Sequence, residues 1–475
     1  MNTRKLLTTA LIAISMGLNA KVKPSALIGD NMILQQQTEV NLWGEASPDA
    51  SIVVTPSWDG QSYTCKADKK GQWILKVKTP EGGYTPYEIT IDDGEKLTLK
   101  NILIGEVWLA SGQSNMEMPL KGFGGCCIMN GMEEIAYSAE NKGVRMFTVP
   151  KRQTYEVQTN CEGQWNIASP STSGDFSATA YHFATSLSRV LQLPVGIVCS
   201  AYGGATVESW MPKEILQNYK DIPLDKEGLE KWLEWERPLL KYNAMLYPVK
   251  NYTIKGFIWY QGESNVRRYE TYTERFATMV QHWRELWGQG ELPFYYVEIA
   301  PYDYDNPAED EKSAFLREAQ FKAQSVIPNS FMVCTNDLVE PFERMNIHPR
   351  NKTDVGRRLS FAALNLTYGQ KQFFIHGPQY KSHRIDGDKI YVSFDHIEMG
   401  LCRNIDLQGF EIAGENKVFY PAEQVTLQWQ TNEVVIRSSK VLQPVAVRYC
   451  FHDFQVGTLI GGFELPAIPF RTDNW

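Results

Sequence analysis

Two residues of this chain could perform nucleophilic chemistry together, a serine and a histidine. Ser114 lies in the run SGQSN (111–115), directly after the short apolar run 106–110. A serine hydroxyl is a weak nucleophile until a neighbouring base removes its proton. His348, in the run NIHP (346–349), has the right intrinsic pKa to be that base. We therefore predict that Ser114 is a nucleophile and that His348 is its general base.

Acyl transfer through a serine also needs hydrogen-bond donors for the oxyanion that forms during the reaction, and losing one donor typically slows the reaction by ~10²–10³-fold. The turn Gly203-Gly204 can expose a backbone N–H because no side chain blocks the approach of a ligand. Gln261 or Asn265 can offer a side-chain amide, and Ser114 can offer its own N–H. The sequence therefore predicts an oxyanion hole drawn from Ser114, Gly204, Gln261 and Asn265.

These residues also have plainer structural explanations. Ser114 could cap a helix, since serine is favoured at that position, and Gly203-Gly204 could be an ordinary turn. We interpret Glu117 and Glu263 as hydrogen-bonding anchors for loops rather than as groups that act on a substrate. The pattern Gly-x-Ser-x-Met around Ser114 differs from the Gly-x-Ser-x-Gly elbow, which argues against the commonest lipase and esterase fold.

The elements that must position these residues alternate between strands and helices. Buried strands are predicted for the apolar runs 106–110, 196–200, 256–260, 294–300 and 331–335, and amphipathic helices for 176–192, 271–287 and 312–326. A further helix follows, which Thr353 could cap and Gly369 could end. This alternation predicts a parallel sheet covered on both faces, with ligands bound beyond the C-terminal ends of its strands.

With 475 residues, the chain is too long for one ordinary core and suggests several domains. Residues 24–103 and 370–475 show alternating strand patterns and predict all-β domains on either side of an α/β domain at 104–369. The basic start and apolar run of residues 1–20 have the form of a secretory signal peptide. We expect an exported protein, periplasmic or extracellular.

Composition narrows the choice of partners. The net charge is −8 and no run rich in Lys or Arg stands out, so we expect no nucleic-acid partner. Beyond the signal peptide, no stretch is apolar and long enough to predict a membrane span. The eight cysteines show no zinc-binding spacing, although Cys126 or Cys127 could pair with Cys161. Oligomeric state is not predicted.

Four blocks of the chain resemble the sialate O-acetylesterase family of the SGNH hydrolases. They are GEVWLASGQSNMEMPL, AYGGATVESWMP, YNAMLYPVKNYTIKGFIWYQGESN and IHPRNKTDVGRRL. The resemblance covers residues 104–368 and implies a flavodoxin-like sheet, Ser114 as nucleophile, His348 as base, and oxyanion donors at Gly204 and in 261–265. It also implies removal of acetyl groups from sugars without a metal or other cofactor.

One position departs from the pattern of the superfamily. Many SGNH enzymes carry an aspartate three residues before the catalytic histidine, where this chain has Met345. Asp337, at a predicted strand end, is our candidate for the third member of the triad, with Glu340 and Glu343 nearer in sequence. A Ser–His dyad, with a backbone carbonyl holding the imidazole, is the other possibility.

We thus expect a serine carbohydrate esterase that removes O-acetyl groups, from O-acetylated sialic acid in the first place, through an acetyl-enzyme. The alternative within enzymes is a deacetylase of acetylxylan or another polysaccharide. The alternatives of another class are a non-catalytic glycan-binding protein and a component of a complex in which the β-domains matter most.

Overall fold

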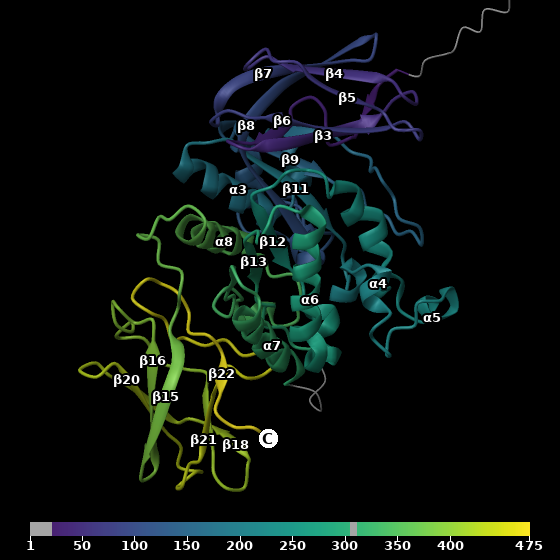
Figure 1. Ribbon diagram of the computed structural model, residues 1–475. Helices are drawn as coiled ribbons and strands as arrows, with labels where there is room; N and C mark the ends of the chain where they lie inside the picture. The colour runs from purple at the N-terminus through teal and green to yellow at the C-terminus, as the bar shows by residue number, and fades with distance from the viewer. Residues whose placement is uncertain (1–20, 305–310) are drawn as a thin grey trace, which may run out of the picture.

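The structure is a computed structural model that describes residues 21–304 and 311–475. The predicted signal peptide, residues 1–20, lies outside the described residues. Three layers of the chain follow one another from top to bottom in Figure 1: an N-terminal β-domain, an α/β-domain and a C-terminal β-domain. Among the described residues, no helix has the length and apolar character that a membrane span requires.

The α/β-domain is built on a parallel sheet, as predicted. Its core strands are β8 (Lys96–Gly112), β11 (Val195–Ala201), β12 (Gly256–Tyr260), β13 (Phe294–Val297) and β14 (Ser330–Val333). They lie in the spatial order β11-β8-β12-β13-β14, which is the 2-1-3-4-5 order of a flavodoxin-like sheet. The sheet extends beyond β11 through the parallel strand β9 (Val144–Thr148) and the antiparallel edge strand β10 (Trp165–Ile167), two strands that we did not predict.

Helices cover both faces of this sheet because successive strand residues point to opposite sides. Trp108 of β8 packs against Phe183 of α3 (Ala178–Leu191), and α8 (Lys352–Leu366) covers the same face. On the other face, Phe257 of β12 packs against Trp283 of α6 (Tyr269–Trp287), next to α7 (Lys312–Val326). The shorter helices are α1 (Ser114–Glu117), α2 (Gly131–Ala136), α4 (Lys213–Leu216) and α5 (Lys226–Glu230).

The N-terminal β-domain is joined to the α/β-domain by strand β8 itself. Its other strands are β1 (Lys23–Pro24), β2 (Ile33–Gln35), β3 (Glu39–Glu45), β4 (Ser51–Pro56), β5 (Tyr63–Lys66), β6 (Gln72–Lys78) and β7 (Gly83–Asp92). The start of β8 pairs with β7 and its end pairs with β11 and β12, so the boundary predicted between 103 and 104 falls inside a continuous strand.

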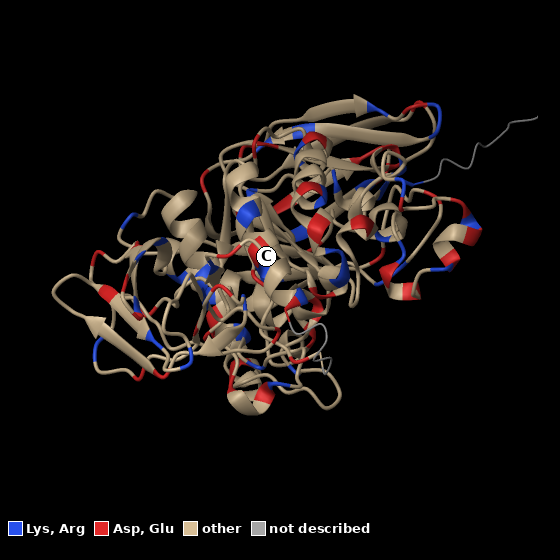
Figure 2. Ribbon diagram, turned by 90° about the horizontal axis from the view of Figure 1, so that it is seen from below, with Lys and Arg blue, Asp and Glu red and all other residues tan. Residues whose placement is uncertain are grey.

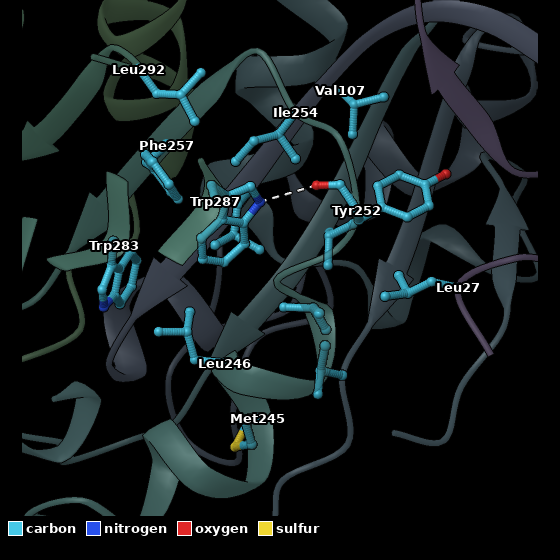
Figure 3. Packing of buried hydrophobic residues seen from close by; sticks show 14 of the residues in the cluster. Leu27, Val107, Met245, Leu246, Tyr252, Ile254, Phe257, Trp283, Trp287 and Leu292 are labelled. Carbon is cyan, nitrogen blue, oxygen red and sulfur yellow. Dashed lines mark hydrogen bonds between the residues drawn. The ribbon is translucent and has the colours of Figure 1, made fainter. Parts of the chain in front are cut away.

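One hydrophobic core also runs across this junction. Leu27 of the N-terminal domain belongs to the same buried cluster as Val107, Tyr252 and Trp287 (Figure 3). The Trp287 Nε1–H donates to the carbonyl of Tyr252 at 3.0 Å, which satisfies the indole inside this core. The two domains are therefore packed as one unit.

The C-terminal β-domain is a sandwich of two four-stranded antiparallel sheets. One sheet has the order β15-β16-β20-β19 and the other β18-β17-β21-β22. The strands are β15 (Gln379–Asp386), β16 (Lys389–Asp395), β17 (Phe410–Ala413), β18 (Phe419–Pro421), β19 (Gln424–Gln428), β20 (Glu433–Arg437), β21 (Ala446–Tyr449) and β22 (Phe470–Arg471).

Polar contacts attach this sandwich to α7. The buried Arg317 donates to the backbone carbonyls of Cys450 and His452, and Arg471 pairs with Glu318 at 3.1 Å. Basic and acidic residues are interspersed in the view of Figure 2, in keeping with this pairing.

Two local expectations were different from the structure. The N-cap of α8 is Asn351, whose side chain accepts from the Asp354 N–H, whereas Thr353 lies inside the helix and contacts His182 at 3.2 Å. Asn351 rather than Thr353 caps the helix because its carboxamide lies directly before the first helical turn, towards which the free N–H groups of that turn point. All eight cysteines are free thiols in the described residues, which therefore contain no Cys126–Cys161 or Cys127–Cys161 pair.

The end of β8 depends on a glycine. Gly112 has φ of +137°, and a methyl group there would lie 2.1 Å from the Tyr260 carbonyl oxygen on β12. We expect Gly112→Ala to lower the free energy of unfolding by more than about 3 kcal/mol, since it adds a backbone clash to an unfavourable φ. Urea denaturation measures this change.

Gly94→Ala is the matched control, because Gly94 has φ of +112° with open space around it. Its substitution should lower the free energy of unfolding by only about 1–2 kcal/mol. Equal losses for the two variants would contradict the close approach of β8 and β12.

Candidate active site

Ser114 stands where β8 passes into helix α1. The Gln113 N–H donates to the Tyr260 carbonyl of β12 at 2.9 Å, which links the end of β8 to β12. Helix α1 begins at the next residue. Ser114 is half-buried at the C-terminal end of the sheet. The N-cap of α1 is Gln113, so the explanation of Ser114 as a helix cap is wrong.

The amides on either side of Ser114 fix its position. The Gln113 side-chain oxygen accepts from the Gly262 N–H at 3.2 Å, which ties the serine turn to the loop after β12. The Asn115 carboxamide nitrogen donates to Glu263 at 2.5 Å and to the Ile347 carbonyl at 3.0 Å. Because Ile347 immediately precedes His348, this one carboxamide joins the segments that carry the serine and the histidine.

A buried lysine completes this network. Lys352, which is 1% exposed, donates its Nζ to the Asn115 side-chain oxygen at 2.6 Å. We did not predict this role, although Lys352 falls in the buried stripe of α8 with Val355 and Leu359, a spacing that could have revealed it. The predicted anchoring role of Glu263 is confirmed by its bond to Asn115.

His348 is positioned by its own loop and by an aromatic ring. The backbone N–H of His348 donates to the Asn346 side-chain oxygen at 3.1 Å. Its imidazole contacts the Phe123 ring edge-to-face, with ring centroids 5.3 Å apart. Burial, together with the nearby charge of Lys352, lowers the pKa of His348 to about 4. The imidazole is therefore neutral at pH 7 and can accept a proton.

Within the described residues, no hydrogen bond joins Ser114 Oγ to the His348 ring. Such bonds are often long in enzymes without substrate and tighten when the substrate binds. The structure thus brings the two residues to one edge of the sheet, and their catalytic roles stay predictions.

Two backbone N–H groups of the predicted oxyanion hole make no hydrogen bond within the described residues. In the described part of the chain, neither the Ser114 N–H nor the Gly204 N–H donates to another group. The turn that carries Gly204 is held by Glu117, which accepts from the Gly203 N–H at 2.6 Å, and by Ser264, which donates to the Gly204 carbonyl at 2.9 Å. The predicted anchoring role of Glu117 is confirmed.

The side-chain amides predicted as oxyanion donors are used elsewhere. Both N–H groups of Gln261 are donated, one to the Ala205 carbonyl at 3.1 Å and one to Asn265 at 2.7 Å. Asn265 in turn donates to Glu208 at 3.0 Å and is 1% exposed. The structure therefore contradicts Gln261 as a donor and gives Asn265 a structural role, because both amides hold the β11 and β12 loops together.

The acidic residues considered for the triad also have other partners. Asp337 forms a two-pronged ion pair with Arg358, with N–O distances of 2.7 and 2.6 Å. Glu343 is buried and accepts from the Arg350 N–H, while Glu340 takes part with it in a capping box. None of the three bonds the His348 ring in the described residues, so the geometry does not support Asp337 as the third member.

A pocket of about 280 Å³ opens at Glu117, the last residue of α1. Its lining includes Glu117, Phe123, Lys151 and Ser177, of which Phe123 also contacts His348. Lys151 pairs with Glu117 at 2.7 Å across the wall of the pocket. Over residues 21–304 and 311–475, no cluster of three or more His, Cys, Asp or Glu side chains could hold a metal ion.

Comparisons with known proteins find relatives that are similar in sequence and in fold. Residues 104–365 match the family described as "Carbohydrate esterase, sialic acid-specific acetylesterase". The human sialate O-acetylesterase is 27% identical over 94% of this chain and 91% of its own length, and the mouse enzyme is 26% identical over 95% and 96%. A crystal structure of a carbohydrate acetylesterase from Xanthomonas citri is 34% identical, covers 96% of this chain and 100% of that one, and superposes with a TM-score of 0.84.

Glu117 provides a test of the turn at Gly203-Gly204. We expect Glu117→Ala to lower kcat for 4-nitrophenyl acetate by roughly 10–100-fold with little change in KM, because the oxyanion donor loses its fixed position. Asp175→Asn is the control, since Asp175 lines the same pocket but its exposed side chain pairs with Lys121 rather than with the Gly203-Gly204 turn. An equal loss of kcat in Glu117→Ala and Asp175→Asn would contradict the positioning role of Glu117.

The buried charge of Lys352 provides a test of His348. The ammonium disfavours a second positive charge, so Lys352→Met should raise the pKa of His348 above about 4 and move the acid limb of the kcat/KM profile to higher pH. Lys322→Met, a surface change on α7, is the control and should leave the limb in place. An unmoved limb in Lys352→Met would show that Lys352 does not act on His348.

Proposed function

Because the chain belongs to the sialic acid-specific acetylesterase family of carbohydrate esterases, we propose that it deacetylates sugars by serine chemistry, with Ser114 as nucleophile and His348 as general base. Family membership makes the protein a carboxylic ester hydrolase that acts on O-acetylated carbohydrates. The proposal adds the residues that perform the reaction and the covalent intermediate.

In the proposed first step, Ser114 Oγ attacks the carbonyl carbon of the acetyl ester while His348 takes the hydroxyl proton. The carbonyl oxygen gains the negative charge and binds to the N–H groups of Ser114 and Gly204. When the C–O bond to the sugar breaks, His348 gives its proton to the departing sugar oxygen. An acetyl group is then bound to Ser114 as an ester.

In the proposed second step, a water molecule gives a proton to His348 and attacks the acetyl carbon. The same two N–H groups stabilise the second oxyanion, and Ser114 recovers its proton from His348 as acetate leaves. Fixed donors stabilise this charge well because they need no reorganisation at the moment of reaction.

The observation that carries the proposal is the pair of unused N–H groups at Ser114 and Gly204, in a site where neighbouring polar groups are already bonded. Uncommitted backbone donors beside a serine suit an oxyanion. A glycan-binding protein without catalysis has no need of them, so we favour the enzyme.

The proposed substrate is an O-acetylated sugar, with O-acetylated sialic acid first because the curated relatives are named sialate O-acetylesterases. Acetylxylan or another polysaccharide is the second candidate, since the Xanthomonas citri relative is named a carbohydrate acetylesterase. The signal-like residues 1–20 support a proposed periplasmic or extracellular location.

Acetate release tests the mechanism. The wild type should release acetate from 9-O-acetyl-N-acetylneuraminic acid or from acetylated xylan, and Ser114→Ala or His348→Ala should lower kcat by at least about 10³-fold. Equal release by wild type and Ser114→Ala would remove Ser114 as nucleophile. A folded wild type that binds these sugars without hydrolysis would favour the glycan-binding alternative.

Asp337→Asn serves as the control and decides the triad. We expect it to lower thermal stability, since Arg358 loses its charged partner, while kcat of the folded protein stays within a few-fold of wild type. A loss of kcat approaching ~10⁴-fold would restore Asp337 as the third member of the triad.

A further inference from the structure

An exposed indole lies against the turn that carries the oxyanion donor. A methyl group added at Gly204 would lie 2.2 Å from Cδ1 and 3.1 Å from Nε1 of Trp235, so one edge of the indole contacts this turn. Even so, Trp235 is 47% exposed, and its neighbour Leu233 is 54% exposed. A large apolar surface left in water next to a reactive site indicates a binding surface.

The backbone around Trp235 is firmly held, so its exposure is built into the fold. The carbonyl of Glu236 accepts from Thr206 Oγ1 and from Ser209 Oγ, each at 3.2 Å. On the other side, the fully buried Lys241 donates to the Glu234 carbonyl at 3.4 Å. The short 3₁₀ turn Glu234–Glu236 is therefore fixed at both ends while its central indole faces solvent.

The same turn is connected to the active-site loops through Arg268. Its guanidinium lies over the Trp232 ring, 4.7 Å from the centroid, and donates to the Ser264 carbonyl at 2.9 Å. Ser264 in turn donates to the Gly204 carbonyl. Arg268 also lies 3.9 Å from Glu236, so Arg268 and Ser264 link the segment that carries Trp235 to the Gly204 turn.

We propose that Trp235 is the platform on which the sugar ring of the substrate stacks. This inference rests on the proposed function. The acetyl carbonyl oxygen would bind at the Gly204 N–H, and the sugar is attached to that carbonyl through a single ester oxygen. The ring must then lie close to the Gly204 turn, where the indole offers a flat apolar surface.

The platform also defines the class of substrate. A pyranose presents an apolar face of C–H groups, which packs on an aromatic ring, and a rim of hydroxyl groups that stay in water. Arg268 is already engaged by Ser264, Trp232 and, at 3.9 Å, Glu236, so the platform itself selects for the face of the ring rather than for a carboxylate. Acetylated pyranosides, neutral ones included, are the expected class.

Two ester substrates test the platform, one with a sugar and one without. For Trp235→Ala, the ratio of kcat/KM for acetylated xylan to kcat/KM for 4-nitrophenyl acetate should fall by roughly tenfold, mainly through KM. Trp235→Phe, which keeps a ring, should retain most of the ratio. Trp429→Ala is the matched control, because Trp429 is 56% exposed in the C-terminal domain, and its ratio should equal that of wild type.

Each other outcome overturns the platform in its own way. Equal losses for both substrates in Trp235→Ala would make Trp235 a mere support of the Gly204 turn, and an unchanged ratio would leave the indole without a role in binding. A wild type that hydrolyses 4-nitrophenyl acetate but no acetylated sugar would overturn the proposed function, and the platform with it.

A binding experiment separates recognition from catalysis. In the Ser114→Ala background, calorimetric titration with acetylated xylo-oligosaccharides should give a Kd about tenfold higher when Trp235→Ala is added. The same Kd with and without Trp235 would overturn the platform even if the protein binds the sugar.

Discussion

The active site depends on one buried carboxamide, that of Asn115. It accepts a hydrogen bond from Lys352 and donates to Glu263 and to the Ile347 carbonyl. A buried ammonium or carboxylate costs several kcal/mol unless hydrogen bonds satisfy it, so Asn115 is fixed by the two charged groups that it bridges. Asn115 directly follows the predicted nucleophile, and Ile347 directly precedes the predicted base. The hydrogen bonds of Asn115 to these buried groups therefore also set where the two reactive residues stand.

Most polar groups around the site position others rather than meet a substrate. Glu117 and Ser264 form hydrogen bonds to the backbone of the Gly203-Gly204 turn. The side-chain amide of Gln261 donates to the Ala205 carbonyl and to Asn265, next to the same turn. This division follows from the electrostatics of catalysis, because a donor stabilises an oxyanion best when other bonds have fixed it beforehand. The proposed binding role of Trp235 follows the same principle, since hydrogen bonds fix its backbone while its indole ring stays exposed to solvent.

Much of the fold could be predicted because hydrophobic periodicity is local. Strand β12 has the predicted bounds, helix α7 begins and ends where the pattern does, and the strand–helix alternation gave the parallel sheet. The short strand β10 was missed, since it has only three residues and lies at an edge. The boundary near 103 was placed where the alternating pattern changes to a continuous apolar run. In the structure that change marks the entry of β8 into a sheet buried on both faces.

The sequence by itself determined which residue types collect at the strand ends, and hence the serine, the histidine and the glycine turn of the candidate site. Only the tertiary structure decided which polar side chains remain available there. Gln261 and Asp337 have suitable side chains at suitable positions in the sequence. In the structure, however, Gln261 donates to Ala205 and Asn265, and Asp337 pairs with Arg358. A hydrogen-bonding group can serve few partners at once, and those partners come from distant segments whose proximity is fixed only when the chain has folded.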